Sequence, residues 1–395
     1  MLMKKYLKSI IMGVAGLFAL TGSHAQTQKD CVQLELRGNK GSKTIVMLMY
    51  SDNSDSKSAR LMPDVEGRYL FNLPNTPFQT VNVMLMNEQS MLVTESGFTP
   101  KPRPTFLIEA GKENIIELNE VDQLNSRLLK GGEESKLYEE IAKQERKYAQ
   151  QSWEVILKKD SLSKLNKSAD DLKKGLSKTG EQLSDNMKSF VATHKNSVAA
   201  LEVFSSYYTG LTIEEATSEF DGFSKKVKGS ELGKVLAQKL LAGKSTNSGE
   251  QIPNFQVITK DGKSFNSKNL EGKYWLIDFW GSWCAPCRAS HPELKALYEQ
   301  YKDENFDILG VAFESGPLDN QLKQWGKAID EDGIQWHHVL NNKENELVKK
   351  FGVTSFPTKL LVDPSGKIIY RSTGGHGEDL ANKLVEVFSK KEKVQ

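Results

Sequence analysis

The sequence has 395 residues, of which 38% are hydrophobic and 26% are charged. This composition excludes a disordered or collagen-like chain, and the length suffices for two or three separately packed domains. The formal net charge is +2, and loss of Lys4, Lys5 and Lys8 with a cleaved leader takes it to −1. A near-neutral chain lacks the basic surface of a nucleic-acid-binding protein, and three cysteines are too few for a disulfide-built scaffold.

Residues 1–25 are typical of a cleavable secretory signal peptide. Three lysines precede the apolar run 10–20, and the small residues Ser23 and Ala25 flank a cleavage point. The eleven residues of this run are fewer than the roughly 20 that a membrane-spanning helix needs, which disfavours the alternative of an uncleaved anchor. We therefore expect a mature chain that begins near Gln26 in an extracytoplasmic, oxidising compartment such as a periplasm.

Residues 26–120 predict a small β-rich domain, because short alternating or apolar runs are separated by turn-forming residues. The runs are 32–36, 44–50, 68–73, 80–86, 105–108 and 114–118. Pro100, Pro102 and Pro104 cannot donate to a sheet ladder, so we expect a loop or an edge there. Cys31 opens the first run; we expect a buried structural thiol, and the alternative is a thiol that reacts or pairs with another chain.

Residues 121–245 change to a helical period, which predicts a helical connector with solvated Lys/Glu-rich faces. The apolar residues that recur on one face are Leu137, Ile141, Tyr148, Leu172, Leu176, Leu183, Met187, Phe190 and Val191. Thr212 and Glu215 have the spacing of a capping box, in which each side chain satisfies a free backbone donor. Residues 242–251 are rich in Gly, Ser, Asn and Lys, which favours a linker before a further domain at 250–392.

A pair of cysteines follows a predicted buried strand. Residues 274–280 are almost entirely apolar, and Cys284-Ala285-Pro286-Cys287 stands between this run and a segment with helical spacing. Cys284 is expected in the first helical turn, where unpaired amide donors and the helix dipole favour a thiolate. Pro286 is tolerated in that turn, and Cys287 lies further into the helix, within reach of Cys284 for a disulfide.

This arrangement predicts thiol-disulfide exchange, in which Cys284 attacks a disulfide and Cys287 resolves the mixed disulfide. A zinc site needs a second pair of ligands, and only Cys31 remains. Haem attachment needs a histidine at the position of Arg288. A static structural disulfide is the third alternative, although so small a ring restricts the unfolded chain little.

Asp278 interrupts the apolar run as a lone carboxylate. Burial disfavours its ionised form, and the resulting affinity for a proton suits an acceptor for the proton of Cys287. The alternative is a structural ion pair with Lys295 or Lys359.

A second candidate position, Phe356-Pro357, precedes another predicted central strand. A proline at this place favours a cis peptide bond and an edge that could pair with an extended substrate. An ordinary trans strand start is the alternative there.

On these motifs, residues 252–392 resemble the TlpA/ResA branch of the thioredoxin-like proteins. The resemblance implies an α/β domain with a central mixed sheet flanked by helices, which acts as a thiol-disulfide oxidoreductase without a metal or cofactor. It also implies disulfide-containing protein substrates and a membrane-associated thiol electron donor. The segment 321–338 resembles the extra helical insert of this branch, and the regions before residue 250 resemble an uncharacterised β-domain and connector.

The resemblance assigns roles to individual residues. Trp280 matches a family tryptophan. Trp283 matches a second one, Cys284 and Cys287 match the nucleophilic and resolving cysteines, Asp278 matches the buried acid of thioredoxin, and Pro357 matches the cis-proline. We expect Trp283, Phe356 and Pro357 to contact the substrate.

Some positions depart from the family pattern. Members that act in cytochrome maturation often carry an acidic residue where this chain has Ala285 or Ser290, which disfavours that role. His291 could face the site from the helix, but we expect a solvated or packing histidine. A different class of function stays open, in which the thioredoxin-like unit is a non-enzymatic scaffold for binding or assembly and an N-terminal domain recognises a partner.

Overall fold

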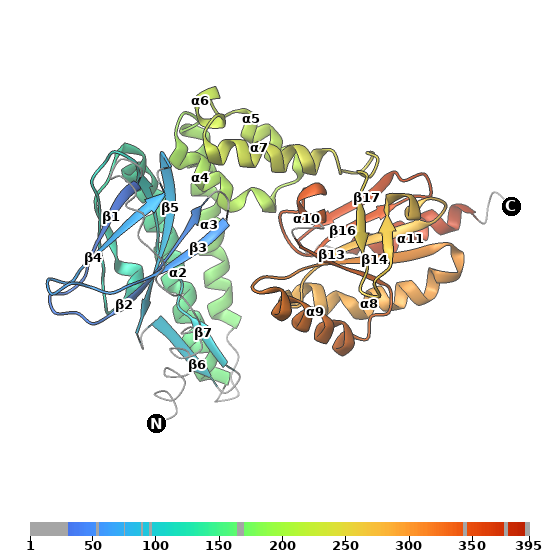
Figure 1. The fold of residues 1–395 in the computed structure, drawn as a ribbon, viewed down its shortest axis with the longest axis horizontal. Helices are drawn as coiled ribbons and strands as arrows, with labels where there is room; N and C mark the ends of the chain where they lie inside the picture. Colours follow the sequence, from blue (N-terminus) through green and yellow to red (C-terminus); the bar gives the residue numbers. More distant parts are fainter. Residues whose placement is uncertain are drawn as a thin grey trace. The chain divides into compact units, whose positions relative to one another are not determined.

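The computed structural model describes residues 31–52, 55–74, 76–87, 90–94, 97–163, 170–342, 346–374 and 378–391 (Figure 1). The predicted signal peptide lies outside these residues. The chain divides into two compact units, Met1–Phe204 and Ser205–Gln395, which are described one at a time. Within the described ranges, no helix is both long enough and apolar enough to cross a membrane.

The first unit contains two four-stranded sheets that share one apolar core. Their strand orders are β10-β9-β1-β4 and β3-β2-β5-β8, and β6 pairs with β7 in a separate ribbon. The strands are β1 (Cys31–Arg37), β2 (Ile45–Asp52), β3 (Asp55–Leu61), β4 (Arg68–Pro74), β5 (Phe78–Met86), β6 (Met91–Thr94), β7 (Gly97–Pro100), β8 (Thr105–Glu109), β9 (Asn114–Glu117) and β10 (Arg127–Lys130).

The six apolar runs predicted as strands all form strands of these sheets. Alternate residues, such as Leu34 and Leu36 in β1, enter the common core, because successive side chains of a strand point to opposite faces. The pattern did not predict β3, β6, β7 or β10, and β10 lies within the range predicted as a helical connector. β3 has the polar sequence DSKSARL and lies at a sheet edge. β3 is held by its pairing with β2 rather than by an apolar pattern of its own.

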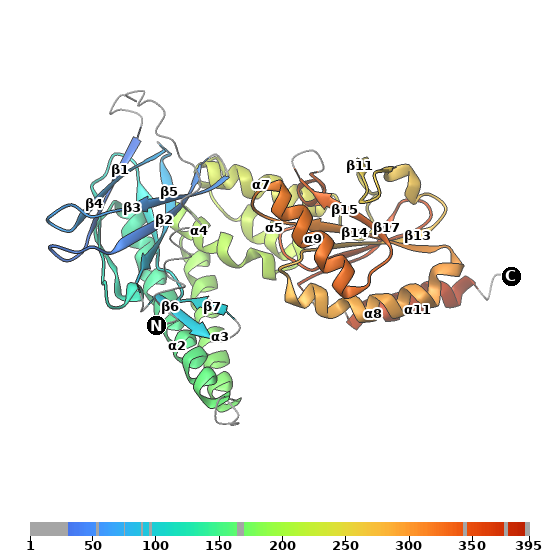
Figure 2. The same cartoon turned by 60° about the horizontal axis from the view of Figure 1, so that its bottom comes forward.

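Two long helices complete the first unit, α2 (Glu133–Ser163) and α3 (Asp170–Thr193), which lie side by side in both views (Figure 2). The 3-10 turn η2 (Gln123–Asn125) precedes them. The buried carboxylate of Glu109, at the end of β8, accepts a hydrogen bond from the Ser135 amide at 2.8 Å. This bond satisfies one of the free amide donors at the start of α2 and ties the helix to the sheet.

The unit boundary falls within α4 (Val198–Tyr207), and a short helical segment opens the second unit. It comprises η3 (Tyr208–Gly210), α5 (Ile213–Asp221), α6 (Lys225–Lys228) and α7 (Glu231–Lys244). The predicted capping box is confirmed at α5. The Glu215 amide donates to Thr212 Oγ1 at 3.2 Å, and the Thr212 amide donates to the Glu215 carboxylate at 2.8 Å.

The segment predicted as a linker, 242–251, is instead packed against the domain that follows. Thr246 is completely buried and its hydroxyl donates to the Phe351 carbonyl at 2.8 Å. Arg371 donates to the Thr246 carbonyl at 3.1 Å. Small polar residues are typical of flexible segments, but in this segment they allow the backbone near Gly243 to approach the backbone of Gly352 closely.

A five-stranded mixed sheet of order β15-β14-β13-β16-β17 forms the centre of the second unit. β13, β14 and β15 are parallel, β16 is antiparallel to β13, and β17 is antiparallel to β16. The elements are β11 (Gln256–Ile258), β12 (Ser264–Asn266), η4 (Ser267–Leu270), β13 (Tyr274–Trp280), α8 (Ala285–Tyr301), η5 (Lys302–Glu304), β14 (Phe306–Phe313), α9 (Leu318–Asp332), β15 (His337–Asn341), α10 (Leu347–Lys350), β16 (Thr358–Val362), β17 (Ile368–Thr373) and α11 (Glu378–Lys391).

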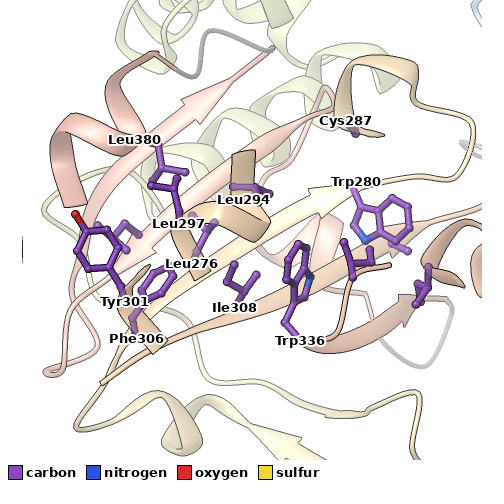
Figure 3. Packing of buried hydrophobic residues seen from close by; sticks show 14 of the residues in the cluster. Leu276, Trp280, Cys287, Leu294, Leu297, Tyr301, Phe306, Ile308, Trp336 and Leu380 are labelled. Carbon is purple, nitrogen blue, oxygen red and sulfur yellow. The ribbon is translucent and has the colours of Figure 1, made fainter. Parts of the chain in front are cut away.

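Each face of this sheet has its own apolar core. Leu276 and Trp280 of β13 pack with residues of α8, α9 and α11, as Figure 3 shows for part of this cluster. The alternate residues Trp275, Ile277 and Phe279 pack on the opposite face with α10 and the β11-β12 hairpin. The predicted α/β class with a central mixed sheet is therefore confirmed. By the same alternation, Asp278 lies on the α8 side of β13.

Candidate active site

The two cysteines lie where the strand-to-helix prediction placed them. Cys284 is the N-cap residue of α8, Pro286 is in the first turn, and Cys284 forms a disulfide with Cys287. The Cys287 amide donates to Cys284 Sγ at 3.3 Å. Cys287 is completely buried, whereas Cys284 retains 3% exposure, so an incoming thiol meets Cys284 first. The helix start directs amide dipoles at Cys284 Sγ, which stabilises negative charge there.

A buried carboxylate fixes the loop before the cysteines. Glu314, directly after β14, accepts hydrogen bonds from the Ser282 amide at 2.6 Å and from the Ser282 hydroxyl at 2.7 Å. Glu314 was not predicted from the sequence. A usable signal existed, since an acidic residue follows a long apolar run, and the carboxyl ends of parallel strands meet at one edge of a sheet.

Asp278 and Lys359 form a buried ion pair at 3.2 Å, with side-chain exposures of 1% and 7%. The two residues are direct cross-strand partners in β13 and β16. The premise of a lone carboxylate was therefore wrong, and the alternative of an ion pair with Lys359 is observed. Lys295 instead donates to the Asp332 carbonyl at 3.1 Å.

A chain of polar contacts joins this ion pair to the cysteine helix. Lys359 Nζ donates to Ser290 Oγ at 3.2 Å, and Ser290 Oγ donates to the Cys287 carbonyl at 2.7 Å. From the sequence, Ser290 was only a departure from the family pattern. In the structure it connects the buried charges to the turn of α8 that holds Cys287.

His291 is buried and packed, so the packing alternative is right and the solvated one is wrong. Its ring lies edge-on to Trp280 at 4.9 Å between centroids, and Nδ1 lies 2.6 Å from Asp332 Oδ2. Arg288 also bonds Asp332, at 2.6 Å. Burial raises the pKa of Asp332, but the hydrogen bonds from Arg288 and His291 outweigh it and leave that pKa below its usual value. This cluster joins α8 to α9.

Aromatic side chains border the cysteines on the solvent side. Trp283 is 55% exposed, and its indole N–H donates to the Phe313 carbonyl at 2.8 Å. Phe356 lies edge-on to Trp283 and stacks on Phe313, with centroid separations of 5.6 Å in both cases. The Phe356-Pro357 peptide bond is cis, as predicted. Trp283 and Phe356 thus form one aromatic surface beside Cys284.

The buried side chain of His338, in β15, is expected to make the stability of the protein depend on pH. Burial lowers the pKa of His338 to about 4, whereas an exposed histidine titrates near 6.5. Because the unfolded chain binds this proton more readily than the folded chain, the contribution of His338 to the unfolding free energy is expected to stay constant above pH ~6.5 and to fall below it. The loss attributable to His338 is about 2–3 kcal/mol at pH ~4.5.

Urea unfolding at neutral pH and at pH ~4.5 measures the loss of unfolding free energy, and the His338→Gln variant serves as the comparison. We expect the wild type to lose about 2–3 kcal/mol more than the variant between neutral pH and pH ~4.5. Equal losses in both proteins would show that His338 does not titrate as its burial requires.

A pair of cysteines at the start of a helix, delivered by a central strand of a mixed sheet with a core on each face, defines a thioredoxin-like thiol-disulfide oxidoreductase. A scan against family models agrees, because the Redoxin model matches residues 247–385.

Curated relatives identify the branch. A thiol-disulfide oxidoreductase ResA of Bacillus thuringiensis subsp. konkukian is 32% identical over 142 residues, which are 36% of this chain and 77% of the relative. The thiol:disulfide interchange protein HelX of Rhodobacter capsulatus is 32% identical over 116 residues, 29% of this chain and 61% of the relative. The chain belongs to the ResA family of thiol-disulfide oxidoreductases.

Solved structures also match part of the chain. The thioredoxin domain of a thiol-disulfide oxidoreductase from Bacteroides vulgatus has 33% identity and a TM-score of 0.32, covering 35% of this chain and 96% of that domain. A thiol-disulfide oxidoreductase from Bacteroides fragilis has 31% identity and a TM-score of 0.31, covering 35% of this chain and 99% of its own.

Proposed function

We propose that this protein reduces or exchanges disulfides in protein substrates through the Cys284/Cys287 couple. The observation that carries the proposal is the Cys287 amide directed at Cys284 Sγ at the start of α8. This donor and the helix dipole favour a thiolate at Cys284, which is the reacting form of a thiol.

The steps balance within the dithiol. The Cys284 thiolate attacks one sulfur of the substrate disulfide, and the other sulfur leaves as a thiolate. Cys287 loses its proton, for which we propose the Asp278 carboxylate as the acceptor. The Cys287 thiolate then attacks the Cys284 sulfur and expels the second substrate thiolate. The substrate gains two electrons and the protein ends with the Cys284–Cys287 disulfide that the structure contains. A membrane-associated thiol donor, suggested by the family, then returns the two electrons.

Location and domain organisation are part of the proposal. The leader at residues 1–25 supports export and the periplasm as the place of action. We assign residues 26–120 to a β-rich domain, 121–245 to a helical connector and 250–392 to the redox domain. Strand β10, within the connector range, pairs with β9 of the β-rich domain.

The aromatic surface of Trp283 and Phe356 is proposed to hold the polypeptide around the substrate disulfide, with Pro357 at its edge. An exposed tryptophan anchored through its indole N–H gives a rigid apolar contact. Trp283→Ala is therefore expected to lower kcat/KM for a protein disulfide relative to that for a small aromatic disulfide, by about 30-fold. Steady-state assays on both substrates measure the ratio, and an unchanged ratio would remove Trp283 from the substrate contact.

Reduction of insulin by the full chain, with dithiothreitol as the electron donor, tests the proposed activity. The wild type is expected to accelerate precipitation of the insulin B chain, and the Cys284→Ala/Cys287→Ala variant is not. Equal rates for the two proteins would contradict the proposal and favour the binding or assembly function that the sequence left open.

A further inference from the structure

A cavity of about 480 Å³ lies within the second unit, outside the cysteine site. Its walls come from the start of α5, from α7, from the loop before Phe356 and from the end of β17. The wall residues used below are Glu214, Lys239, Asn247, Thr354, Arg371 and Gly374.

Fixed contacts hold these walls together. Thr246, after α7, donates to the Phe351 carbonyl at 2.8 Å, and Arg371 of β17 donates to Thr246 Oγ1 at 3.0 Å. The backbones of Gly243 and Gly352 approach so closely that a Cβ on Gly352 would overlap the Gly243 amide. Helix α7 and the loop before Phe356 therefore present one fixed surface to the cavity.

The charge of the walls favours an anion. Arg371 directs its hydrogen bonds to neutral oxygens, those of Thr246 and the carbonyls of Phe351 and Gly352. Burial lowers the pKa of Arg371 to about 10, which still leaves a cation at neutral pH. Among the described residues, no carboxylate forms an ion pair with Arg371 or with Lys239.

The wall carboxylate, Glu214, does not offset both cations. It already accepts a hydrogen bond from Asn247 at 2.5 Å. Two cations without an ion pair, one of them partly buried, leave the cavity electropositive, and a bound carboxylate would gain charge-assisted hydrogen bonds there.

The cavity also adjoins the proposed substrate surface. Thr354 in its wall lies two residues before Phe356, and the amide of Gly374, another wall residue, donates to the Pro357 carbonyl at 2.8 Å. A polypeptide bound beside Phe356 needs only a few extended residues to reach the cavity.

We propose that this cavity binds an aspartate or glutamate side chain of the substrate polypeptide, close in sequence to its reactive cysteine. The inference rests on the proposed function and specifies its substrate class as acidic around the disulfide. Helices α5 and α7 lie before the region 247–385 that the family model matches, so this recognition uses helices outside the common domain.

Peptide binding tests the cavity without any redox step. The probe is a fluorescent peptide with serine in place of cysteine and two aspartates set at successive distances from it; a second peptide carries asparagines instead. In the Cys284→Ser/Cys287→Ser protein, we expect the acidic peptide to bind about tenfold more tightly than the amide peptide. Adding Lys239→Glu should abolish this ratio. Lys234→Glu, on the same helix but outside the cavity, should keep it.

Equal binding of the two peptides at every spacing would overturn the proposal. A ratio lost equally in the Lys234→Glu protein would also overturn it, because a diffuse surface field would then explain the preference. Turnover of the cysteine-containing amide peptide, paired through a disulfide, reports separately on the proposed function. If the wild-type protein does not turn over this peptide, but the acidic peptide still binds more tightly than the amide peptide, the oxidoreductase proposal is contradicted. Binding of acidic side chains in the cavity would then stand on its own.

Discussion

Replacing Cys284 by serine is expected to abolish disulfide reduction, whereas replacing Cys287 by serine is expected to trap the substrate on the protein. Without Cys284 no thiolate stands at the start of α8, and the completely buried Cys287 cannot be reached by a bulky disulfide. Without Cys287 the first attack still occurs, but nothing within the chain expels the substrate from Cys284. The expected loss of kcat/KM is at least 10³-fold for Cys284→Ser.

Non-reducing electrophoresis and mass spectrometry of the trapped species provide the measurement. The Cys287→Ser protein should gain the mass of one substrate polypeptide, and dithiothreitol should release it. A Cys31→Ser control should behave as the wild type, because the proposed chemistry does not use that thiol. Trapping on the Cys284→Ser protein at the level seen for Cys287→Ser would reverse the assigned roles.

The second large effect is expected at the buried ion pair. Lys359→Met leaves the Asp278 carboxylate buried without its cation, and this is expected to lower the unfolding free energy by about 3–5 kcal/mol. Replacing both residues, as Asp278→Leu/Lys359→Met, removes both charges and should restore stability to within about 1 kcal/mol of the wild type. Lys383→Met, which breaks the more exposed pair with Glu386, should cost less than about 1 kcal/mol.

The stable double variant also tests the proposed chemical role of Asp278. If this carboxylate accepts the proton of Cys287, release of the mixed disulfide should slow by about 10²-fold, although the protein is folded. Stopped-flow measurement of substrate release separates this step from the first attack. A double variant that is stable and resolves at the wild-type rate would limit Asp278 and Lys359 to a structural role.

Local signals in the sequence predicted the parts of the site that are close in the chain. The apolar run before Cys284 and the proline after it predicted the strand, the helix start and the disulfide partner, because all three are encoded within 15 residues. The Phe356-Pro357 peptide and the Thr212 capping box were predicted for the same reason.

The remaining contacts join residues that are far apart in sequence. Ser290 meets Lys359 across 69 positions, His291 meets Asp332 across 41, and Ser282 meets Glu314 across 32. No periodicity or cap reports such pairs, since they depend on how strands and helices pack. The ion pair of Asp278 was only partly predictable from the sequence. Lys359 could be named as a possible partner, but the strand register that places it opposite Asp278 could not be predicted.

Segment 242–251 illustrates an opposite error, in which a correct local pattern gave a wrong structural interpretation. Helix α7 ends within this segment, at Lys244. Burial of Thr246 depends on Phe351 and Arg371, which lie more than 100 positions later, so its composition predicted a linker where the fold has a packed contact.

The central claim is that the start of α8 keeps the Cys284 sulfur ionised in neutral solution. Its most direct test is the rate of alkylation of reduced Cys284 by iodoacetamide as a function of pH, in a Cys31→Ser protein, with modification at Cys284 followed by mass spectrometry. We expect the rate to reach half its maximum below pH ~7.5, as for thiolates stabilised at a helix start. A rate that rises only around pH ~8.5, as for an ordinary thiol, would contradict the account.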